Sequence, residues 1–191
     1  MSPHYAEAQL WLAMALQSLN DAEGALAAYE RVLELAPDTA PYGVFIGDIH
    51  LAAGRLDEAR AAYEQALAAF PDAGLAHYGL ARVLEAQGDA GAVDELRRTV
   101  ENAPDFVDAR LRLGHLLRLQ GRLEEALEHL LHASRLDGRD ATVRLELALV
   151  YEALERTAEA ENEFRAVLRL DPNNEEASRG LQRLREAVQA D

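Results

Sequence analysis

Prolines recur along this chain at a spacing close to 34 residues. Five of the six prolines follow this period, with steps of 34, 34, 33 and 68, the last being twice the period. They are Pro3, Pro37, Pro71, Pro104 and Pro172, and the skipped position falls at Gly138. Four of them are followed directly by Asp or Asn, at Asp38, Asp72, Asp105 and Asn173. Because proline ends a helix and Asp or Asn caps the next one, each pair predicts the end of one helix and the start of another.

A second set of residues lies midway between the prolines and predicts a tight corner. Its members are Asn20, Gly54, Gly88 and Gly121. Gly and Asn adopt, at little cost, the left-handed backbone conformation that ends a helix. Each unit is therefore predicted to hold two helices joined by a short corner. Glu155 occupies this place in the last unit, and we expect it to carry about 1 kcal/mol of backbone strain.

Apolar and small residues recur with the same period. An apolar residue followed by a small one marks the first helix, as in Leu12-Ala13, Ile46-Gly47, Leu80-Ala81, Leu113-Gly114 and Leu147-Ala148. On the second helix an alanine precedes a large residue by four positions, as in Ala25-Tyr29, Ala59-Tyr63, Ala92-Leu96, Ala126-Leu130 and Ala160-Phe164. Small residues let helix axes approach, and large ones fill the neighbouring groove. Since Ala and Leu supply 69 of the 191 residues, the chain is predicted to be all-α.

These motifs resemble those of tetratricopeptide repeat proteins. The resemblance implies a right-handed α-solenoid of stacked antiparallel helix pairs, formed by the whole chain as a single array. The repeats are expected at about 6–39, 40–73, 74–106, 107–140 and 141–174, with a capping helix at about 175–189. The third repeat departs from the pattern, because Gly88 and Ala92 are four residues apart where Gly54 and Ala59 are five apart. We expect a distorted corner there.

The composition excludes several kinds of chemistry. The chain has no cysteine and all 19 basic residues are arginine, which excludes thiolate metal sites, thiol nucleophiles, Schiff bases and P-loop lysines. No serine stands in a nucleophile elbow, and no carboxylate pair has a predicted cleft to serve. We therefore predict no catalytic residue, no cofactor and no enzymatic activity. The net charge of −15 also argues against nucleic-acid binding, because it repels a phosphate backbone.

The histidines are interpreted as structural residues. His129 and His132 have the i, i+3 spacing of two ligands on one helix face, but two ligands do not make a zinc site, so no metal site is predicted. Both are expected to face solvent on the outer side of their helix. His50 stands where leucine or tyrosine recurs in other repeats, and we expect it to be a half-buried packing residue.

The stacked first helices are expected to line a concave groove that holds an extended or helical peptide. The candidate groove residues are Trp11, Met14, Phe45, Asp48, Tyr78, Arg82, Arg112, His115 and Arg118. Their aromatic members are expected to contact apolar side chains, and their arginines to hold an acidic side chain or a C-terminal carboxylate. In the alternative interpretation, Arg82 pairs with Glu85 and Arg112 with Asp108, and these surface ion pairs bind nothing. The Lys and Asn residues with which family members bind chaperone tails have no counterpart here, so that activity is not predicted.

The predicted function is a non-catalytic protein interaction scaffold, or adaptor, that binds a peptide or protein segment in its groove. The alternatives are an accessory or assembly domain of a larger enzyme-associated or secretion component and, with less support, an RNA-binding helical repeat. The first helix has no predicted repeat before it, which suggests either a fragment of a longer array or self-association through this uncapped end. The apolar run 10–19 is about half the roughly 20 residues that span a bilayer, so a cytoplasmic location is expected. The sequence does not indicate the identity of the partner.

Overall fold

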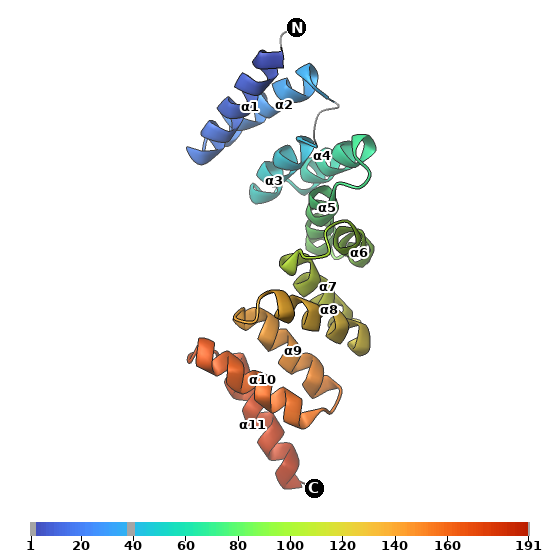
Figure 1. Cartoon of the computed structure of the whole chain (residues 1–191), viewed down its shortest axis with the longest axis vertical. Helices are drawn as coiled ribbons and strands as arrows, with labels where there is room; N and C mark the ends of the chain where they lie inside the picture. Colours follow the sequence, from blue (N-terminus) through green and yellow to red (C-terminus); the bar gives the residue numbers. More distant parts are fainter. Residues whose placement is uncertain (1–2, 38–40, 191) are drawn as a thin grey trace. The chain divides into compact units, whose positions relative to one another are not determined.

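A computed structural model describes residues 3–37 and 41–190 of the chain. All regular secondary structure in these ranges is helical, which confirms the predicted all-α class (Figure 1). The helices are α1 (Pro3–Ser18), α2 (Ala22–Leu35), α3 (Gly43–Ala52), α4 (Leu56–Ala69), α5 (Gly74–Gln87), α6 (Ala92–Asn102), α7 (Val107–Leu119), α8 (Leu123–Leu136), α9 (Ala141–Ala153), α10 (Thr157–Leu170) and α11 (Glu175–Ala190). Asp38, one of the predicted capping residues, lies outside the described ranges.

Contacts between helices divide the chain into two units, residues 1–103 and residues 104–191. The first unit contains the hairpins α1–α2, α3–α4 and α5–α6, and the second contains α7–α8, α9–α10 and the additional helix α11. Within each unit, the second helix of a hairpin packs on the first helix of the next. First helices also touch one another directly, α3 with α5 and α7 with α9. This repeated packing is that of an all-α helical-repeat fold.

Each hairpin has a left-handed residue at the predicted corner. The φ angle is +59° at Asn20 and Glu155, +72° at Gly54, +70° at Gly88 and +75° at Gly121. The next residue donates its backbone N–H to the carbonyl five positions earlier, as Arg55 does to His50 at 2.9 Å. This bond satisfies a carbonyl at the helix end and turns the chain back on itself. The left-handed conformation expected at Glu155 is therefore confirmed.

The third corner differs from the other four. Helix α6 begins at Ala92, four residues after Gly88, whereas the other second helices begin two residues after their left-handed residue. It is 11 residues long, and the other second helices are 14 residues long. The Asp89 Oδ1 accepts the N–H of Gly91 at 2.8 Å and holds the additional turn. The shortened spacing predicted this distorted corner correctly.

The prediction that the residue after each proline caps the next helix is wrong. Helices α5 and α7 follow Ala73 and Phe106, and neither start has a side-chain cap. Helix α11 has an asparagine cap at Asn174, whose Oδ1 accepts the N–H of Ala177 at 2.9 Å. The chain needs one more residue after the proline to turn, so the predicted capping residues stand one position too early. These residues are Asp72, Asp105 and Asn173.

The large residue of a second helix packs against small residues on two first helices. Tyr63 of α4 is fully buried, and its ring lies so close to Gly47 of α3 and Gly79 of α5 that a Cβ atom on either glycine would overlap it. Phe164 of α10 packs against Gly180 of α11 in the same way. Because the contact reaches the next hairpin, it holds neighbouring hairpins together as well as closing its own.

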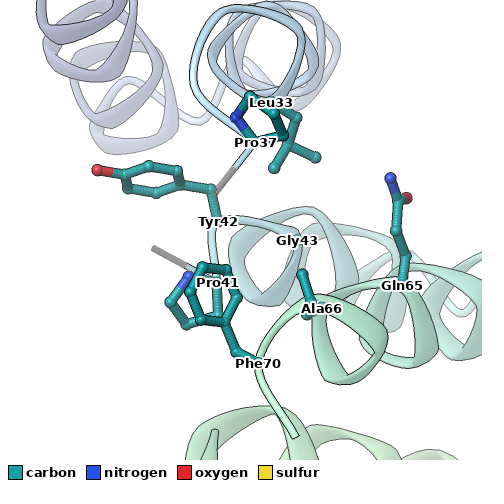
Figure 2. Close-up of a pocket in the computed structure, with 9 residues that line it drawn as sticks. Leu33, Pro37, Pro41, Tyr42, Gly43, Gln65, Ala66 and Phe70 are labelled. Atoms are coloured by element: carbon teal, nitrogen blue, oxygen red, sulfur yellow. The ribbon is translucent and has the colours of Figure 1, made fainter. Parts of the chain in front are cut away.

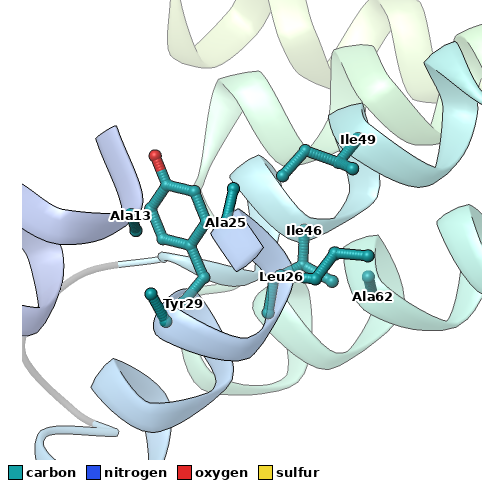
Figure 3. Packing of buried hydrophobic residues seen from close by; sticks show 8 residues of the cluster. Ala13, Ala25, Leu26, Tyr29, Ile46, Ile49 and Ala62 are labelled. Carbon is teal, nitrogen blue, oxygen red and sulfur yellow. The ribbon is translucent and has the colours of Figure 1, made fainter. Parts of the chain in front are cut away.

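Tyr29 has the equivalent place in the first hairpin. It is fully buried in a cluster with residues of α1, α2, α3 and α4. Figure 3 shows its ring beside Ala13 and Ala25, with Leu26 and Ile46 on the side of the second hairpin. The apolar period of the sequence thus places the core at the junctions between helices, where each large residue meets small ones.

Three long polar side chains tie a first helix to the linker before it. His77, Arg110 and Arg144 occupy the same repeat position, and each bonds the backbone carbonyl six residues earlier, at Pro71, Pro104 and Gly138 respectively. His77 also contacts Glu95 at 2.6 Å, and Arg144 donates to Glu163 at 2.8 Å. The bond at Gly138 shows that this linker keeps the contact without its proline. Sequence analysis did not identify this role.

Helix α11 covers the last hairpin with its apolar side. Ala177 is fully buried and Leu181 nearly so, while Leu184 is half-buried. The side chain of Val188, the fourth member of the predicted apolar stripe, lies outside the described part of the structure. The remaining faces of the helix carry Glu, Arg and Gln, as expected for a terminal cap. Among the described residues, no helix combines the length and apolar character needed to span a membrane.

We expect Gly79→Ala to destabilise the first unit although alanine favours a helix more than glycine. The added methyl group overlaps the buried Tyr63 ring, and overpacking of this kind costs roughly 1–3 kcal/mol. Urea denaturation would measure the loss. Gly74→Ala is the matched control, because its Cβ would lie 3.5 Å from the nearest atom and should be neutral or stabilising by up to about 1 kcal/mol. Equal stability of the two variants would contradict the proposed close packing.

We expect Glu155→Gly to stabilise the protein. The residue has a φ of +59° in the α9–α10 corner, and glycine adopts this conformation without the roughly 1 kcal/mol cost of a side chain. Thermal and urea unfolding would both show the increase. Gly121→Ala, in the equivalent corner with a φ of +75°, should lose a similar amount. Unchanged stability in both variants would show that the corners relax instead of storing strain.

Candidate functional site

The predicted site residues lie on first helices of both units. Six of them form what we call the first-unit row: Trp11 and Met14 on α1, Phe45 and Asp48 on α3, and Tyr78 and Arg82 on α5. The other three, Arg112, His115 and Arg118, all lie on α7 and form the second-unit row. Because the two rows belong to different units, each is a candidate site by itself.

The apolar members of the first-unit row are exposed. Trp11 is 62% exposed, Met14 45% and Phe45 37%. Phe45 is held in place from below by the buried Tyr29, whose ring stacks on it with centroids 5.2 Å apart and an interplanar angle of 12°. An exposed aromatic side chain fixed on a rigid helix offers apolar contact area at little entropic cost.

The polar members of the first-unit row form one connected group. Asp48 accepts a hydrogen bond from the Tyr63 hydroxyl at 2.7 Å and lies 3.7 Å from an Arg82 nitrogen. The Arg82 guanidinium lies 5.8 Å from the centroid of the Tyr78 ring on its own helix. Asp48 and Arg82 both keep about two-fifths of their side chains exposed. The row therefore presents an acceptor and a donor side by side.

Burial, and then the hydrogen bond to Asp48, raise the pKa of Tyr63 above its ordinary value. The phenol therefore stays protonated and remains a donor to the carboxylate at physiological pH. Tyr63 was predicted only as a packing residue. Its hydroxyl also orients Asp48 from beneath the row, which the repeat pattern does not reveal because it specifies only a large side chain at this place.

The cations of the second-unit row are turned toward the protein. His115 Nδ1 lies 2.9 Å from Glu146 Oε1, and Arg118 Nε donates to Glu146 Oε2 at 2.8 Å. Glu146 belongs to α9 and is 9% exposed. Glu146 was not among the predicted site residues, although it stands at the repeat position of Trp11, Phe45 and Arg112 on the first helices. His115 and Arg118 therefore pair with an acid of the next first helix. The sequence had predicted either a carboxylate of a bound peptide or ion pairs within one helix.

The same pattern continues to the last helix. Arg183 of α11 donates two hydrogen bonds to Glu152 of α9, at 2.8 and 2.7 Å. These bonds, with Glu176 nearby, raise the pKa of the Arg183 guanidinium. Ion pairs and hydrogen bonds of Arg or His with Glu thus join α7 to α9 and α9 to α11. They lie on the side of the helices where a peptide was predicted to bind.

The histidines have structural surroundings. His50 is half-buried, as expected, and its Nδ1 is buried without a hydrogen-bond partner. His129 and His132, expected to face solvent, are both partly exposed and lie beside polar groups, with 32% of the His132 side chain exposed. His129 lies 3.5 Å from Arg110, and His132 lies 3.8 Å from Asp105. In the described ranges, no three metal-binding side chains gather in one place.

A cavity of about 110 Å³ lies in the first unit (Figure 2), and Tyr42 in its lining stacks with Phe45 of the row. It is bounded by the end of α2, the start of α3 and the end of α4, and its lining includes Leu33, Tyr42, Gly43 and Phe70. Gly43 stands at the repeat position that His77 occupies in the next hairpin. Because glycine has no side chain, Gly43 cannot form the hydrogen bond with a preceding backbone carbonyl that His77 forms with Pro71.

Family models describe most of this chain as tetratricopeptide repeat. One such model matches residues 6–39, a second matches residues 46–92, and a third matches residues 86–169. The matches were obtained with different members of the same repeat class, and together they cover the hairpins of both units.

Curated relatives share the repeat over part of their length. DnaJ homolog subfamily C member 3 from Rattus norvegicus is 43% identical over 82 residues, which are 42% of this chain and 16% of that protein. Anaphase-promoting complex subunit 7 from Arabidopsis thaliana is 28% identical over 171 residues, which are 85% of this chain and 29% of that protein. The chain thus spans less than a third of the length of either relative.

Solved structures match the fold over nearly the whole chain. YrrB, described as a TPR protein with an unusual peptide-binding site, has a TM-score of 0.77 and 26% identity, covering 91% of this chain and 90% of its own. The Cut9–Hcn1 hetero-tetramer of the APC/C has a TM-score of 0.76 and 22% identity, covering 96% of this chain and 37% of its own. With the recurring corners, the aromatic-to-glycine contacts and the family matches, these likenesses show that the chain belongs to the tetratricopeptide repeat family.

Proposed function

We propose that this protein is a non-catalytic interaction scaffold that binds a peptide or protein segment along the first-unit row. The observation that carries the proposal is the exposure of Trp11, Met14 and Phe45 on first helices of the unit that also contains the Asp48–Arg82 pair. Exposed apolar side chains grouped with a few placed polar groups are typical of protein-binding surfaces. Proteins of this repeat family are in general scaffolds without catalytic activity.

The chemistry of the row suits an extended or helical segment. Trp11 and Phe45 supply large contact areas that become buried when a partner covers them. Asp48 can accept a hydrogen bond and Arg82 can donate one, so the pair complements the N–H and C=O groups of a bound main chain. Tyr63 and Tyr29 hold Asp48 and Phe45 from below, which reduces the entropy lost when a partner binds.

We assign the second-unit row a secondary part in binding. Arg118 and His115 must separate from Glu146 before they can hold a carboxylate of a partner. Removing one member of a buried pair leaves an uncompensated charge, and this cost weakens any such contact. Arg112 also has an interaction within the protein. We therefore propose the first-unit row as the main binding surface and treat the second-unit row as a separate, weaker candidate.

The comparisons agree with a scaffold role. YrrB is described as having a peptide-binding site, and the Arabidopsis relative and the Cut9–Hcn1 structure are subunits of an assembly. We propose further that the five sequence ranges from 6–39 to 141–174 are the repeating units of one array. A cytoplasmic location stays a prediction from the sequence.

Binding along the row can be tested with peptides selected from a random displayed library. For a selected peptide, we expect Met14→Ser to weaken binding about tenfold, because it removes exposed apolar contact area from the row. The single tryptophan, Trp11, reports binding by its fluorescence, and calorimetry gives the affinity. Leu136→Ser is the matched control, since Leu136 is similarly exposed at 41% but lies on α8 of the second unit. Equal loss in both variants would locate binding elsewhere.

A second candidate function is assembly through the face of α1. Leu12 is 45% exposed, while the residues at its repeat position in the other first helices are 7% exposed or less. Those residues are Ile46, Leu80, Leu113 and Leu147. A side chain of this type normally packs under another helix, so the face of α1 that carries Leu12 suits association with a second molecule.

Sedimentation over a range of concentrations tests this second candidate. We expect a reversible dimer that Leu12→Asp converts to a monomer, because a charge would have to be buried at the interface. The control is Leu119→Asp, an even more exposed leucine on α7, which should leave the dimer unchanged. A monomer at every concentration of the unmodified protein would remove self-association and leave the row proposal unaffected.

A further inference from the structure

We infer that the partner of the first-unit row is a basic segment with apolar side chains, rich in Arg or Lys, and not an acidic tail. This inference rests on the proposed function and specifies the chemistry of the partner at the same surface. It reverses the expectation that arginines of the row hold a carboxylate. Three observations support it: the pairing of the first unit's arginines, its excess of acids and the composition of the row.

Five of the six arginines of the first unit are paired with acids of the same unit. The described ion pairs are Arg31 with Glu34, Arg55 with Glu23, Arg60 with Glu64, Arg82 with Asp48, and Arg98 with Glu95. The sixth, Arg97, also has an interaction within the protein. An acidic ligand would have to compete with these internal carboxylates for each guanidinium.

Acids greatly outnumber bases in this unit. Residues 1–103 contain 6 arginines and 16 acidic residues, a net charge of −10, whereas residues 104–191 contain 13 and 18, a net charge of −5. The summed field of the first unit therefore repels an acidic segment and attracts a basic one, which raises the association rate and suppresses wrong partners.

Acidic residues also outnumber basic ones at the repeat positions in and around the first-unit row. Glu7 on α1 and Glu85 on α5 stand at repeat positions of the predicted inner side, in addition to Asp48. Arg82 is the one basic residue at the corresponding positions of the first unit, and it lies 3.7 Å from Asp48. The Asp48 side chain is 43% exposed, so a cation of a partner can approach the carboxylate from the solvent side.

The apolar residues set the other requirement. Trp11 is largely exposed and Phe45 partly so, and arginine stacks on aromatic rings as well as pairing with carboxylates. A segment that alternates apolar and basic side chains satisfies the apolar row and the surrounding acids together. A purely basic polyelectrolyte leaves the apolar surface uncovered, and a purely apolar segment makes no use of the acids.

The test examines the charge of peptides selected by the unmodified protein from a random displayed library at about 50 mM salt. We expect selected peptides to be enriched in Arg and Lys next to apolar residues. For the best peptide, replacement of its basic residues by Gln should weaken binding about tenfold and replacement by Glu further still. Raising the salt to about 500 mM should bring the affinities of the basic and Gln forms together.

The variant Asp48→Asn tests whether the preference for a basic peptide arises from the first-unit row. This variant should weaken binding of the basic peptide several-fold and leave the Gln form nearly unchanged, with circular dichroism confirming the fold. Asp72→Asn removes the same charge from an exposed turn outside the row and should have little effect. If selected peptides are neutral or acidic but still lose affinity in Met14→Ser, the basic partner is wrong and the proposed binding surface stands. If no peptide binds, both proposals fail.

Discussion

The contact of a large second-helix residue with small residues on two first helices is the interaction on which the structure depends. At Tyr63 the ring lies against Gly47 within its own hairpin and against Gly79 of the next one. The same side chain thus sets the angle within a hairpin and the distance to the following hairpin. Since close packing tolerates little change of volume, a repeated pair of large and small residues specifies how neighbouring hairpins pack within a unit.

This packing contact also positions the candidate site. Tyr63 reaches across the interior so that its hydroxyl meets Asp48 on the neighbouring first helix. Tyr29 of α2 stacks on Phe45 of the following first helix, and its hydroxyl donates to Gln17 of α1 at 3.0 Å. Two side chains of the row, Phe45 and Asp48, are thus in direct contact with buried tyrosines of the core. Binding surfaces held in this way lose little entropy when a partner arrives.

The sequence predicts the fold well because the fold is periodic. Every corner lies at the left-handed residue that the spacing indicates, including Glu155, where the residue type is unfavourable. The sequence predicts polar partners poorly, because they depend on geometry beyond the repeat. The pairing of Arg118 with Glu146 joins residues 28 positions apart, and the bond of Arg144 to the Gly138 carbonyl uses a backbone atom that no residue type reveals. The capping prediction was wrong for a related reason. The capping position depends on the length of the turn after each proline, which the residue types do not specify.

The two units show how one scaffold can use the same repeat positions differently. In the second unit, Arg118 of α7 and Glu146 of α9 form an ion pair, and this pair joins the two first helices. In the first unit the corresponding side includes Trp11, which is largely exposed, and Phe45, which stays 37% exposed although its ring stacks with those of Tyr29 and Tyr42. An exposed apolar group gains most from a partner, and a satisfied ion pair gains least. The capacity to bind is therefore expected where the repeat leaves its apolar residues uncovered.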